Sequence, residues 1–247
     1  MAKTILVTGA SSGIGRAIAI ACARSGYTVV LNGRNVAKLH ETMRLMKELE
    51  SEGVREVEYL IIPADLTDSA QRQALAEHVP VLNGVVHCAG IGSRVLCKML
   101  ETDDVQHVMD ANFNAPVLLQ AALLQEKKIA AGSSIVFIAS AAATMPSIGN
   151  AIYSASKAAL ISYAKCLSLE LAARKIRVNC ISPAMVWTNL ALVGATEEQL
   201  QEAEQAYPLK RYAQPDDIAP MAVYLLSDEA SWITGSNYEL TGGALTL

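Results

Sequence analysis

The stretch TGASSGIG, residues 8–15, follows directly on the apolar run ILV at residues 5–7, and a segment that favours a helix begins at Arg16. Glycines at such a turn allow the backbone to bend tightly and to approach a ligand closely. The amide groups at the start of the next helix attract a negative charge such as a pyrophosphate. Three glycines can also be incidental here, and their G-x-x-x-G-x-G spacing differs from the familiar G-x-G-x-x-G. Their place after the first strand favours a dinucleotide-binding loop formed by Gly9, Ser11, Ser12, Gly13, Ile14 and Gly15.

Strand-like and helix-like segments alternate along the whole chain. Short, almost purely apolar runs occur at residues 5–7, 29–31, 60–62, 85–86 and 135–138. A further run at residues 178–181 is broken by Asn179, and we expect a final strand near residues 238–240. Segments with helical spacing occupy residues 16–24, 36–50, 69–78, 103–127, 155–173, 197–206 and 216–226. Continuous apolar runs are typical of a parallel sheet that is covered on both faces. The alternation therefore predicts an α/β fold with a doubly wound parallel sheet of the Rossmann type, in a single domain over residues 1–247.

Composition excludes several classes of protein. Of 247 residues, 52% are hydrophobic and 18% are charged, which excludes a disordered or fibrous chain. The net charge of −4 gives no basic footprint for nucleic acid. The longest uncharged stretch, residues 129–156, is interrupted by glycine, serine and proline, so we expect no membrane span.

The cysteines and histidines bear on compartment and metals. The five cysteines never form a C-x-x-C pair, and the polar turn in the N-terminal residues leads us to expect no export signal, so we expect reduced thiols in a cytoplasmic protein. The four histidines show no metal-binding spacing, and we expect no metal site.

The end of the second predicted strand bears on the choice of dinucleotide. An acidic residue there would bind the ribose 2′-hydroxyl of NAD, whereas an arginine accommodates the 2′-phosphate of NADP. Residues 31–35 read LNGRN, with no acid and with Arg34 as the cation. Arg34 could instead merely occupy the start of a helix. We interpret the segment as selecting NADP(H).

Tyr153 and Lys157 are spaced to share one face of a helix. A nearby ammonium favours phenolate and lowers the pKa of a tyrosine from its usual value of about 10. A tyrosine tuned in this way can exchange a proton with a carbonyl or alcohol oxygen. The Y-x-x-x-K pattern alone occurs on many surfaces by chance. Here Ser140 precedes it by thirteen residues, at the carboxyl end of the apolar run 135–138, where this fold places ligands.

Further motifs follow in order along the chain. Asp65-Leu66 comes after the third strand and Ala89-Gly90 after the fourth. The motif RVNCISP occupies residues 177–183, and TGG occupies residues 241–243. With the glycine loop, Ser140, Tyr153 and Lys157, these motifs make the chain resemble the short-chain dehydrogenase/reductase family along essentially its full length. Within that family it looks most like the reductases of 3-oxoacyl thioesters.

The resemblance implies roles for four catalytic positions. Tyr153 would be the acid/base, and Lys157 would lower its pKa and bind the nicotinamide ribose. Ser140 would polarise the substrate carbonyl. Asn112 would hold a water in the proton relay to Lys157, although Asn114 competes for that role on local sequence.

The resemblance also implies contacts to the cofactor. Asp65 would meet adenine, and Val186 and Thr188 would hold the carboxamide. Further cofactor contacts fall to Leu66, Cys88, Ala89, Gly90 and Pro183.

Two positions depart from the family pattern. His87-Cys88 stands where the family usually has two asparagines, and a thiol cannot make the hydrogen bonds of an amide. Local support of the sheet is therefore in doubt at this point. We expect His87 to be a structural rather than a catalytic histidine. Ala184 replaces a common glycine after Pro183, which slightly restricts that loop.

Residues 184–212 form the expected cover of the substrate. This cover carries the apolar side chains Met185, Trp187, Leu190, Leu192 and Val193, and we expect Met145 and Leu96 to face them across the cavity. Such a lining suits an apolar or acyl-bearing ketone. The alternatives are a dehydrogenase of sugars, polyols or steroid-like alcohols, or a protein that senses NADP without turnover.

The expected partners follow from the same resemblance. Lys127-Lys128 and Arg174-Lys175 could dock an acyl carrier protein, or could simply place positive charge at helix C-termini. A coenzyme A thioester is the other expected acyl donor. The family also implies a homotetramer, or a homodimer, paired through the helices at residues 103–127 and 155–173.

Overall fold

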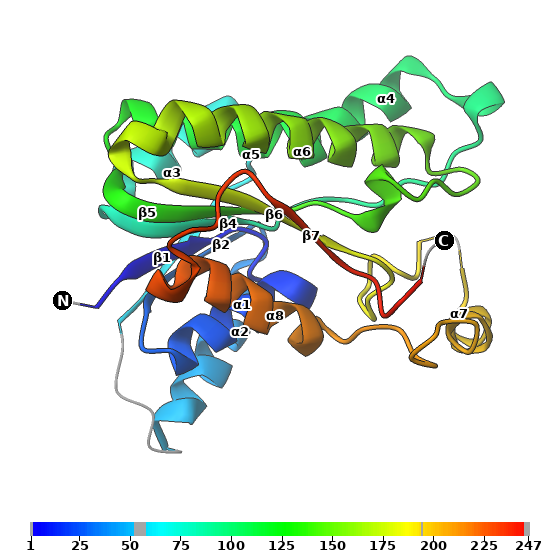
Figure 1. Ribbon diagram of the computed structural model, residues 1–247, viewed down its shortest axis with the longest axis horizontal. Helices are drawn as coiled ribbons and strands as arrows, with labels where there is room; N and C mark the ends of the chain where they lie inside the picture. The colour runs from blue at the N-terminus through cyan, green and yellow to red at the C-terminus, as the bar shows by residue number, and fades with distance from the viewer. Residues whose placement is uncertain (1, 52–57, 194, 245–247) are drawn as a thin grey trace.

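The computed structural model describes residues 2–51, 58–193 and 195–244, and within them the chain forms one parallel seven-stranded sheet. The strand order is β3-β2-β1-β4-β5-β6-β7 (Figure 1). The strands are β1 (Thr4–Val7), β2 (Thr28–Gly33), β3 (Tyr59–Pro63), β4 (Leu82–His87), β5 (Ile129–Ile138), β6 (Arg177–Pro183) and β7 (Asn237–Leu240). The order reverses between β1 and β4, which confirms the doubly wound α/β fold.

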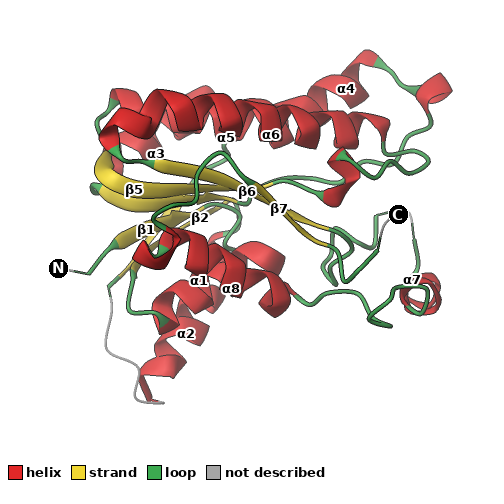
Figure 2. Cartoon of the chain, viewed as in Figure 1, coloured by secondary structure: helices red, strands yellow, loops and turns green. Residues whose placement is uncertain are grey.

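Helices cover both faces of the sheet, as Figure 2 shows. One layer contains α1 (Gly13–Arg24), α2 (Val36–Ser51) and α8 (Pro215–Leu226). The other contains α3 (Ser69–His78), α4 (Thr102–Met109), α5 (Ala115–Gln125) and α6 (Ala151–Leu171). The short helix α7 (Glu197–Glu204) lies apart from both layers, beyond the carboxyl ends of the strands.

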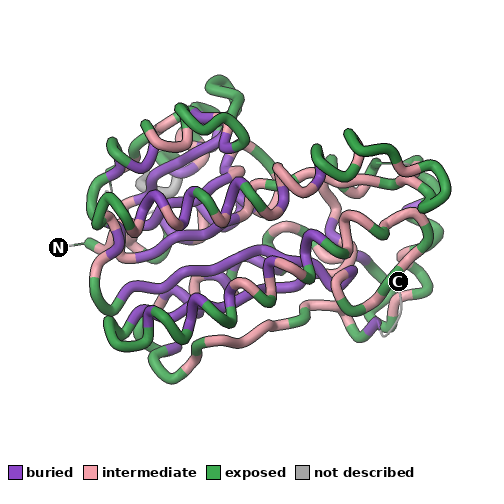
Figure 3. The backbone as a smooth tube through the Cα atoms, turned by 90° about the horizontal axis from the view of Figure 1, so that it is seen from above, coloured by how far each residue is buried: buried purple, intermediate pink, exposed green. Residues whose placement is uncertain are grey.

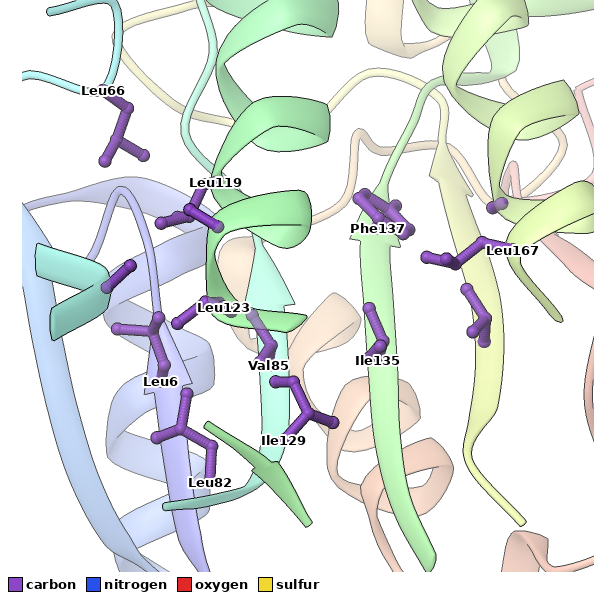
Figure 4. Close-up of a cluster of buried hydrophobic side chains, with 14 of the residues drawn as sticks. Leu6, Leu66, Leu82, Val85, Leu119, Leu123, Ile129, Ile135, Phe137 and Leu167 are labelled. Atoms are coloured by element: carbon purple, nitrogen blue, oxygen red, sulfur yellow. The ribbon is translucent and has the colours of Figure 1, made fainter. Parts of the chain in front are cut away.

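Two hydrophobic cores explain why the strands read as continuous apolar runs. Ile5 and Val7 of β1 pack toward α1 and α8, whereas Leu6 between them packs on the opposite face with α5. In β5, Ile135 and Phe137 belong to the second core (Figure 4). Buried residues are accordingly concentrated along the strands and on the sides of the helices that face them (Figure 3). Burying each such side chain contributes about 1.5–3 kcal/mol, so both faces stabilise the sheet.

The predicted helix at residues 103–127 is interrupted. After α4 the chain makes one wider π turn, Asp110–Asn114, before α5 begins. Pro116 stands just after the π turn, and its missing N–H removes one hydrogen bond from this otherwise continuous helix. The wider turn places Asn112 inside the protein, fully buried. The helix α6 begins at Ala151, so Tyr153 lies in its first turn.

Two further findings concern the described residues as a whole. No helix among residues 2–51, 58–193 and 195–244 is long and apolar enough to cross a membrane. In the same residues no cluster of three or more His, Cys, Asp or Glu side chains is arranged to hold a metal ion.

Candidate active site

A cavity of about 630 Å³ lies at the carboxyl ends of the strands. It brings together every cofactor-binding and catalytic position expected from the sequence except Asn112. These lining residues are Gly9, Ser11, Ser12, Gly13, Ile14, Gly15, Arg34, Asp65, Leu66, Cys88, Ala89, Gly90, Ser140, Tyr153, Lys157, Pro183, Val186 and Thr188.

The glycine loop needs its glycines because the backbone approaches itself and its neighbours closely. Gly9 has a φ of +67°, and a Cβ there would lie 3.0 Å from the main chain of Ala89. A Cβ on Gly15 would lie 2.3 Å from the carbonyl oxygen of Gly9. Ser12, the N-cap of α1, makes no capping hydrogen bond through its side chain. The first amides of α1 are thus free of side-chain caps at the cavity wall, which fits a pyrophosphate.

Thr8 holds the chain after β4, and this role was not recognised in the sequence. Its hydroxyl oxygen accepts hydrogen bonds from the N–H groups of Cys88 (3.0 Å) and Ala89 (3.1 Å). The same hydroxyl donates to the carbonyl oxygen of Val86 at 3.4 Å. Local support at Cys88 therefore comes from Thr8 and does not need an amide side chain at position 88. The signal was available, since Thr8 begins the glycine stretch.

Arg34 and Asp65 face each other at one end of the cavity, with 3.7 Å between a guanidinium nitrogen and a carboxylate oxygen. Hydrogen bonds from Thr67, then the charge of Arg34, hold the pKa of Asp65 below its usual range. The Arg34 side chain is 72% exposed, so this pair is weak and the guanidinium is free to bind another anion.

Lys157 is buried in the wall beside Tyr153. Its ammonium donates a hydrogen bond to the carbonyl oxygen of Ile138 at 3.0 Å and lies 5.9 Å from the centroid of the Tyr153 ring. Burial lowers the pKa of Lys157 to about 8. The ammonium is therefore held in place and loses its proton at a lower pH than an exposed lysine does.

Ser140 is oriented by the turn that follows β5. Its hydroxyl oxygen accepts a hydrogen bond from the N–H of Ala142 at 3.1 Å, which leaves the O–H to donate toward Tyr153. The expected lowering of the Tyr153 pKa is not found in the protein alone. Burial of the phenol raises the pKa, and the hydrogen bond from Ser140 offsets this only in part. The spacing in the sequence shows Lys157 near the phenol but does not show the loss of solvent around it, which disfavours phenolate.

Asn112 lies behind the cavity wall, in the π turn. Its amide oxygen accepts from the N–H of Ile91 at 2.8 Å, and its amide nitrogen donates to the carbonyl oxygen of Ile91 at 3.0 Å. The same nitrogen donates to the hydroxyl of Ser156 at 3.3 Å. The exposed Asn114 instead donates to Asp110. Between the two candidates, only Asn112 supports the site, and its role in holding a water stays a prediction.

His87 is buried and does not line the cavity. Its ring stacks on Phe137 with 4.6 Å between centroids, and its Nε2 donates to the side-chain oxygen of Gln120 at 3.0 Å. Burial lowers the pKa of His87 to about 4, so the ring is neutral at physiological pH. These contacts agree with a structural role for His87.

The cover of the cavity was predicted in part. Met185, Leu190 and Val193 line it, and Leu190 and Val193 lie against Gly92 on the opposite wall. Four expected lining residues were wrong, because a loop without periodicity gives no sign of which side chains point inward: Trp187, Leu192, Met145 and Leu96.

Trp187 turns toward the helix α7 instead. Its indole N–H donates to the carboxylate of Glu204 at 2.9 Å, and its ring packs against Tyr212.

The basic pairs lie far from the cavity, at the amino ends of the strands. Lys128 donates to the carbonyl oxygens of Glu77 and Val79 at 2.8 and 2.9 Å. Arg174 donates to the carbonyl oxygen of Ile129, the first residue of β5, at 2.5 Å. Lys128 thus interacts with the carboxyl end of α3, whereas Arg174 binds the main chain of β5; the docking of an acyl carrier protein stays a prediction.

Comparisons with known proteins agree with this geometry. The family model described as enoyl-(acyl carrier protein) reductase matches residues 9–244. The chain is 33% identical to an L-xylulose reductase of Caenorhabditis elegans, over 98% of this chain and 95% of that protein. It is also 33% identical to a 3-oxoacyl-[acyl-carrier-protein] reductase of Rickettsia felis, over 98% and 97%. A solved structure described as a short chain dehydrogenase/reductase family protein is 32% identical, with a TM-score of 0.85 over 98% of this chain and 96% of that one. The chain belongs to the short-chain dehydrogenase/reductase family, whose members are oxidoreductases that use NAD(P)(H).

Proposed function

We propose that this protein is an NADP(H)-dependent reductase of carbonyl compounds and that 3-oxoacyl thioesters are its substrates. The observation that carries the proposal is one cavity whose wall holds Ser140, Tyr153 and Lys157 and whose other end holds the glycine loop and Arg34. A hydroxyl, a phenol and an ammonium side by side suit proton transfer to an oxygen.

The residues present fit a nicotinamide dinucleotide along the length of the cavity. The glycine loop and the start of α1 would hold the pyrophosphate, and Asp65 the adenine. Arg34 would hold a 2′-phosphate, because no acid stands at the end of β2 to bind a free 2′-hydroxyl. Lys157 would bind the nicotinamide ribose, and Val186 and Thr188, which line the cavity, would hold the carboxamide. When bound, the cofactor supplies the hydride.

The side chains of this chain would position the carbonyl and move its proton. The Ser140 O–H donates a hydrogen bond to the carbonyl oxygen and holds it beside the Tyr153 phenol. Tyr153 gives its proton to that oxygen as the hydroxyl of the product forms. Lys157, hydrogen-bonded to the main chain of Ile138, stabilises the phenolate that remains. In the direction of oxidation the same groups act in reverse.

The thioester assignment rests on the lining of the cover and on the relatives. Met185, Leu190 and Val193 form an apolar wall that suits an acyl chain and excludes water. The 3-oxoacyl-[acyl-carrier-protein] reductase of Rickettsia felis agrees with this class. The L-xylulose reductase is equally similar, so a sugar or polyol substrate is the second candidate.

The proposal is tested by measuring the consumption of NADPH with acetoacetyl coenzyme A. The rate is compared with the rate when NADH replaces NADPH and with the rate when L-xylulose replaces the thioester. Turnover of the thioester with NADPH supports it. Turnover of the sugar alone would replace the substrate class. The protein could also bind NADPH tightly and reduce neither compound. If it then failed to oxidise polyol or steroid alcohols with NADP+ as well, the result would favour a sensor.

Self-association is part of the same proposal. The outward face of α6 carries a row of small or apolar exposed side chains: Ala151, Ala155, Ala158, Ser162, Cys166 and Leu169. Leu169 is 79% exposed, and Leu118 of the neighbouring helix α5 is 47% exposed. Small side chains allow two helices to approach closely, so we propose a homodimer through this face or a homotetramer built from it. Sedimentation of the protein, with Leu169→Glu as the disrupting variant, tests it. The cytoplasmic location stays a prediction.

A further inference from the structure

Four charged side chains line the cavity, and one of them has no partner within the protein. They are Arg34, Asp65, Arg94 and Lys157. Arg34 faces Asp65, and Lys157 donates to the main chain of Ile138. Arg94 makes no hydrogen bond or ion pair with any residue that the structure describes. Its guanidinium is exposed and carries five N–H donors, which are available to a ligand.

The position of Arg94 is fixed even though its guanidinium is free. The N–H of the next residue, Val95, donates to the carbonyl oxygen of Gly149 at 2.9 Å. The Cγ of Arg94 lies 3.0 Å from the place that a Cβ on Gly149 would occupy. Three residues earlier, Ile91 is held by Asn112. The Arg94 stem therefore rests on the turn that leads into α6, four residues before Tyr153.

That placement puts the stem of Arg94 on the Tyr153 side of the cavity, whose wall Arg94 also lines. Four residues of chain span at most about 14 Å, which bounds the distance between the Cα atoms of Gly149 and Tyr153. The wall facing this segment is apolar, with Leu190 and Val193 against Gly92. Among the described residues that line the cavity, the acidic residue is Asp65, and it lies at the opposite end beside Arg34. A cation at the substrate end therefore has no acid to neutralise it.

We propose that Arg94 is a specificity-determining residue that binds an oxyanion, a carboxylate or a phosphate, carried by the carbonyl substrate. The inference rests on the proposed function in one respect, namely that the cavity takes an oxo compound. An arginine recognises a carboxylate or a phosphate through two parallel N–H···O bonds, which gives orientation as well as affinity. A neutral sugar or ester offers no such partner.

Three compounds that share the 3-oxobutanoyl group separate the possible sources of the anion. Ethyl acetoacetate is neutral, acetoacetate carries a carboxylate close to the carbonyl, and acetoacetyl coenzyme A carries phosphates at the far end of its pantetheine arm. Their binding is measured by calorimetry on protein saturated with NADP+, because an oxo compound and the oxidised cofactor form a complex that cannot react. The binding result then does not depend on turnover.

We expect the protein to bind at least one of the anionic compounds tenfold or more tightly than the ester, with a preference that weakens as salt is added. Arg94→Ala should bring the ratio of the affinity for the preferred anionic compound to the affinity for the ester close to one. Arg94→Lys should keep part of the preference, because an ammonium supplies the charge without the paired donors. Lys98→Ala, on an exposed neighbour that does not line the cavity, should keep all of it.

A preference for acetoacetate identifies a carboxylate near the carbonyl, and a preference for the coenzyme A thioester identifies the phosphate of the arm. The proposal is overturned if the parent protein binds neither anion better than the ester, or if Arg94→Ala keeps the preference. Turnover with NADPH is measured separately. If no turnover were found but the protein still preferred an anionic compound in a way that depends on Arg94, the proposed function would be contradicted. The assignment of the anion site would then be retained.

Discussion

Asn112 and Ile91 are joined by two hydrogen bonds, one to the N–H and one to the carbonyl oxygen of Ile91. With its third bond, to Ser156, the Asn112 side chain ties the π turn to the segment after β4 and to α6. A Cβ added to Gly90 would lie 3.0 Å from the Asn112 oxygen and 3.4 Å from the Lys157 nitrogen. This buried amide therefore fixes three segments that border the cavity.

Asn112→Ala should destabilise the fold and lower activity. It leaves the N–H and the carbonyl of Ile91 without their partner, and an unsatisfied buried polar group costs about 1–3 kcal/mol. Urea denaturation measures the loss. Asn114→Ala is the matched control, because Asn114 is exposed in the same turn and bonds only Asp110. Equal effects of the two substitutions would show that the Ile91 bonds are not what matters.

Thr8→Val should lower the free energy of unfolding by about 1–3 kcal/mol, since it keeps the shape but removes the acceptor for two main-chain N–H groups. It should also raise the KM for the cofactor, because Cys88 and Ala89 line the cavity. Thr8→Ser keeps the hydroxyl and should behave like the parent. If Thr8→Val matched Thr8→Ser in both denaturation and KM, support of this loop would have to come from elsewhere.

Lys157 should make stability rise with pH above about pH 8. Its pKa is about 8 in the folded protein and about 10.4 in the unfolded chain. Between these values the unfolded chain binds more protons, so the free energy of unfolding increases as the pH rises. The full difference corresponds to about 3 kcal/mol.

The difference between the parent and Lys157→Met, followed by urea denaturation from pH 7 to pH 10.5, isolates this contribution. Other titrating groups are common to both proteins. Lys165→Met, on the exposed side of the same helix, should follow the parent. A parent curve parallel to that of Lys157→Met would mean that burial does not perturb this ammonium.

Arg34→Ala should raise the KM for NADPH at least tenfold and the KM for NADH by a much smaller factor. A hydrogen bond to a charged group contributes about 1.5–3 kcal/mol, and only NADPH has the 2′-phosphate to receive it. Steady-state kinetics with both cofactors give the two values. Arg44→Ala, which removes an exposed cation from α2, controls for a general effect of charge. Equal increases for both cofactors would remove the basis for NADP selection.

The sequence predicted the parts of the site that depend on spacing along regular elements. Tyr153 and Lys157 were expected on one helical face, and both line the cavity. The π turn around Asn112 was not predicted from the apolar pattern, although Pro116, which lacks an N–H, was a sign of an irregular helix at this point. The orientations of Trp187 and Leu192 were wrong because their loop has no periodicity.

Arg94 was missed for a similar reason. It lies in an irregular segment whose approach to Gly149 is set by a contact between distant parts of the chain. One signal was present, since Arg94 is the sole Lys, Arg, Asp or Glu between Glu77 and Lys98.

The most direct test of the central claim is the rate of acetoacetyl coenzyme A reduction by NADPH in the parent protein and in Tyr153→Phe. Removing a positioned proton donor should lower kcat by a factor of about 100 or more. NADPH binding, followed by calorimetry, should be retained. Tyr163→Phe removes a hydroxyl farther along α6 and keeps the ring that packs against Phe137, so it should retain turnover. If Tyr153→Phe reduced acetoacetyl coenzyme A as fast as the parent protein, the result would contradict the account, because the phenol would then not be the proton donor.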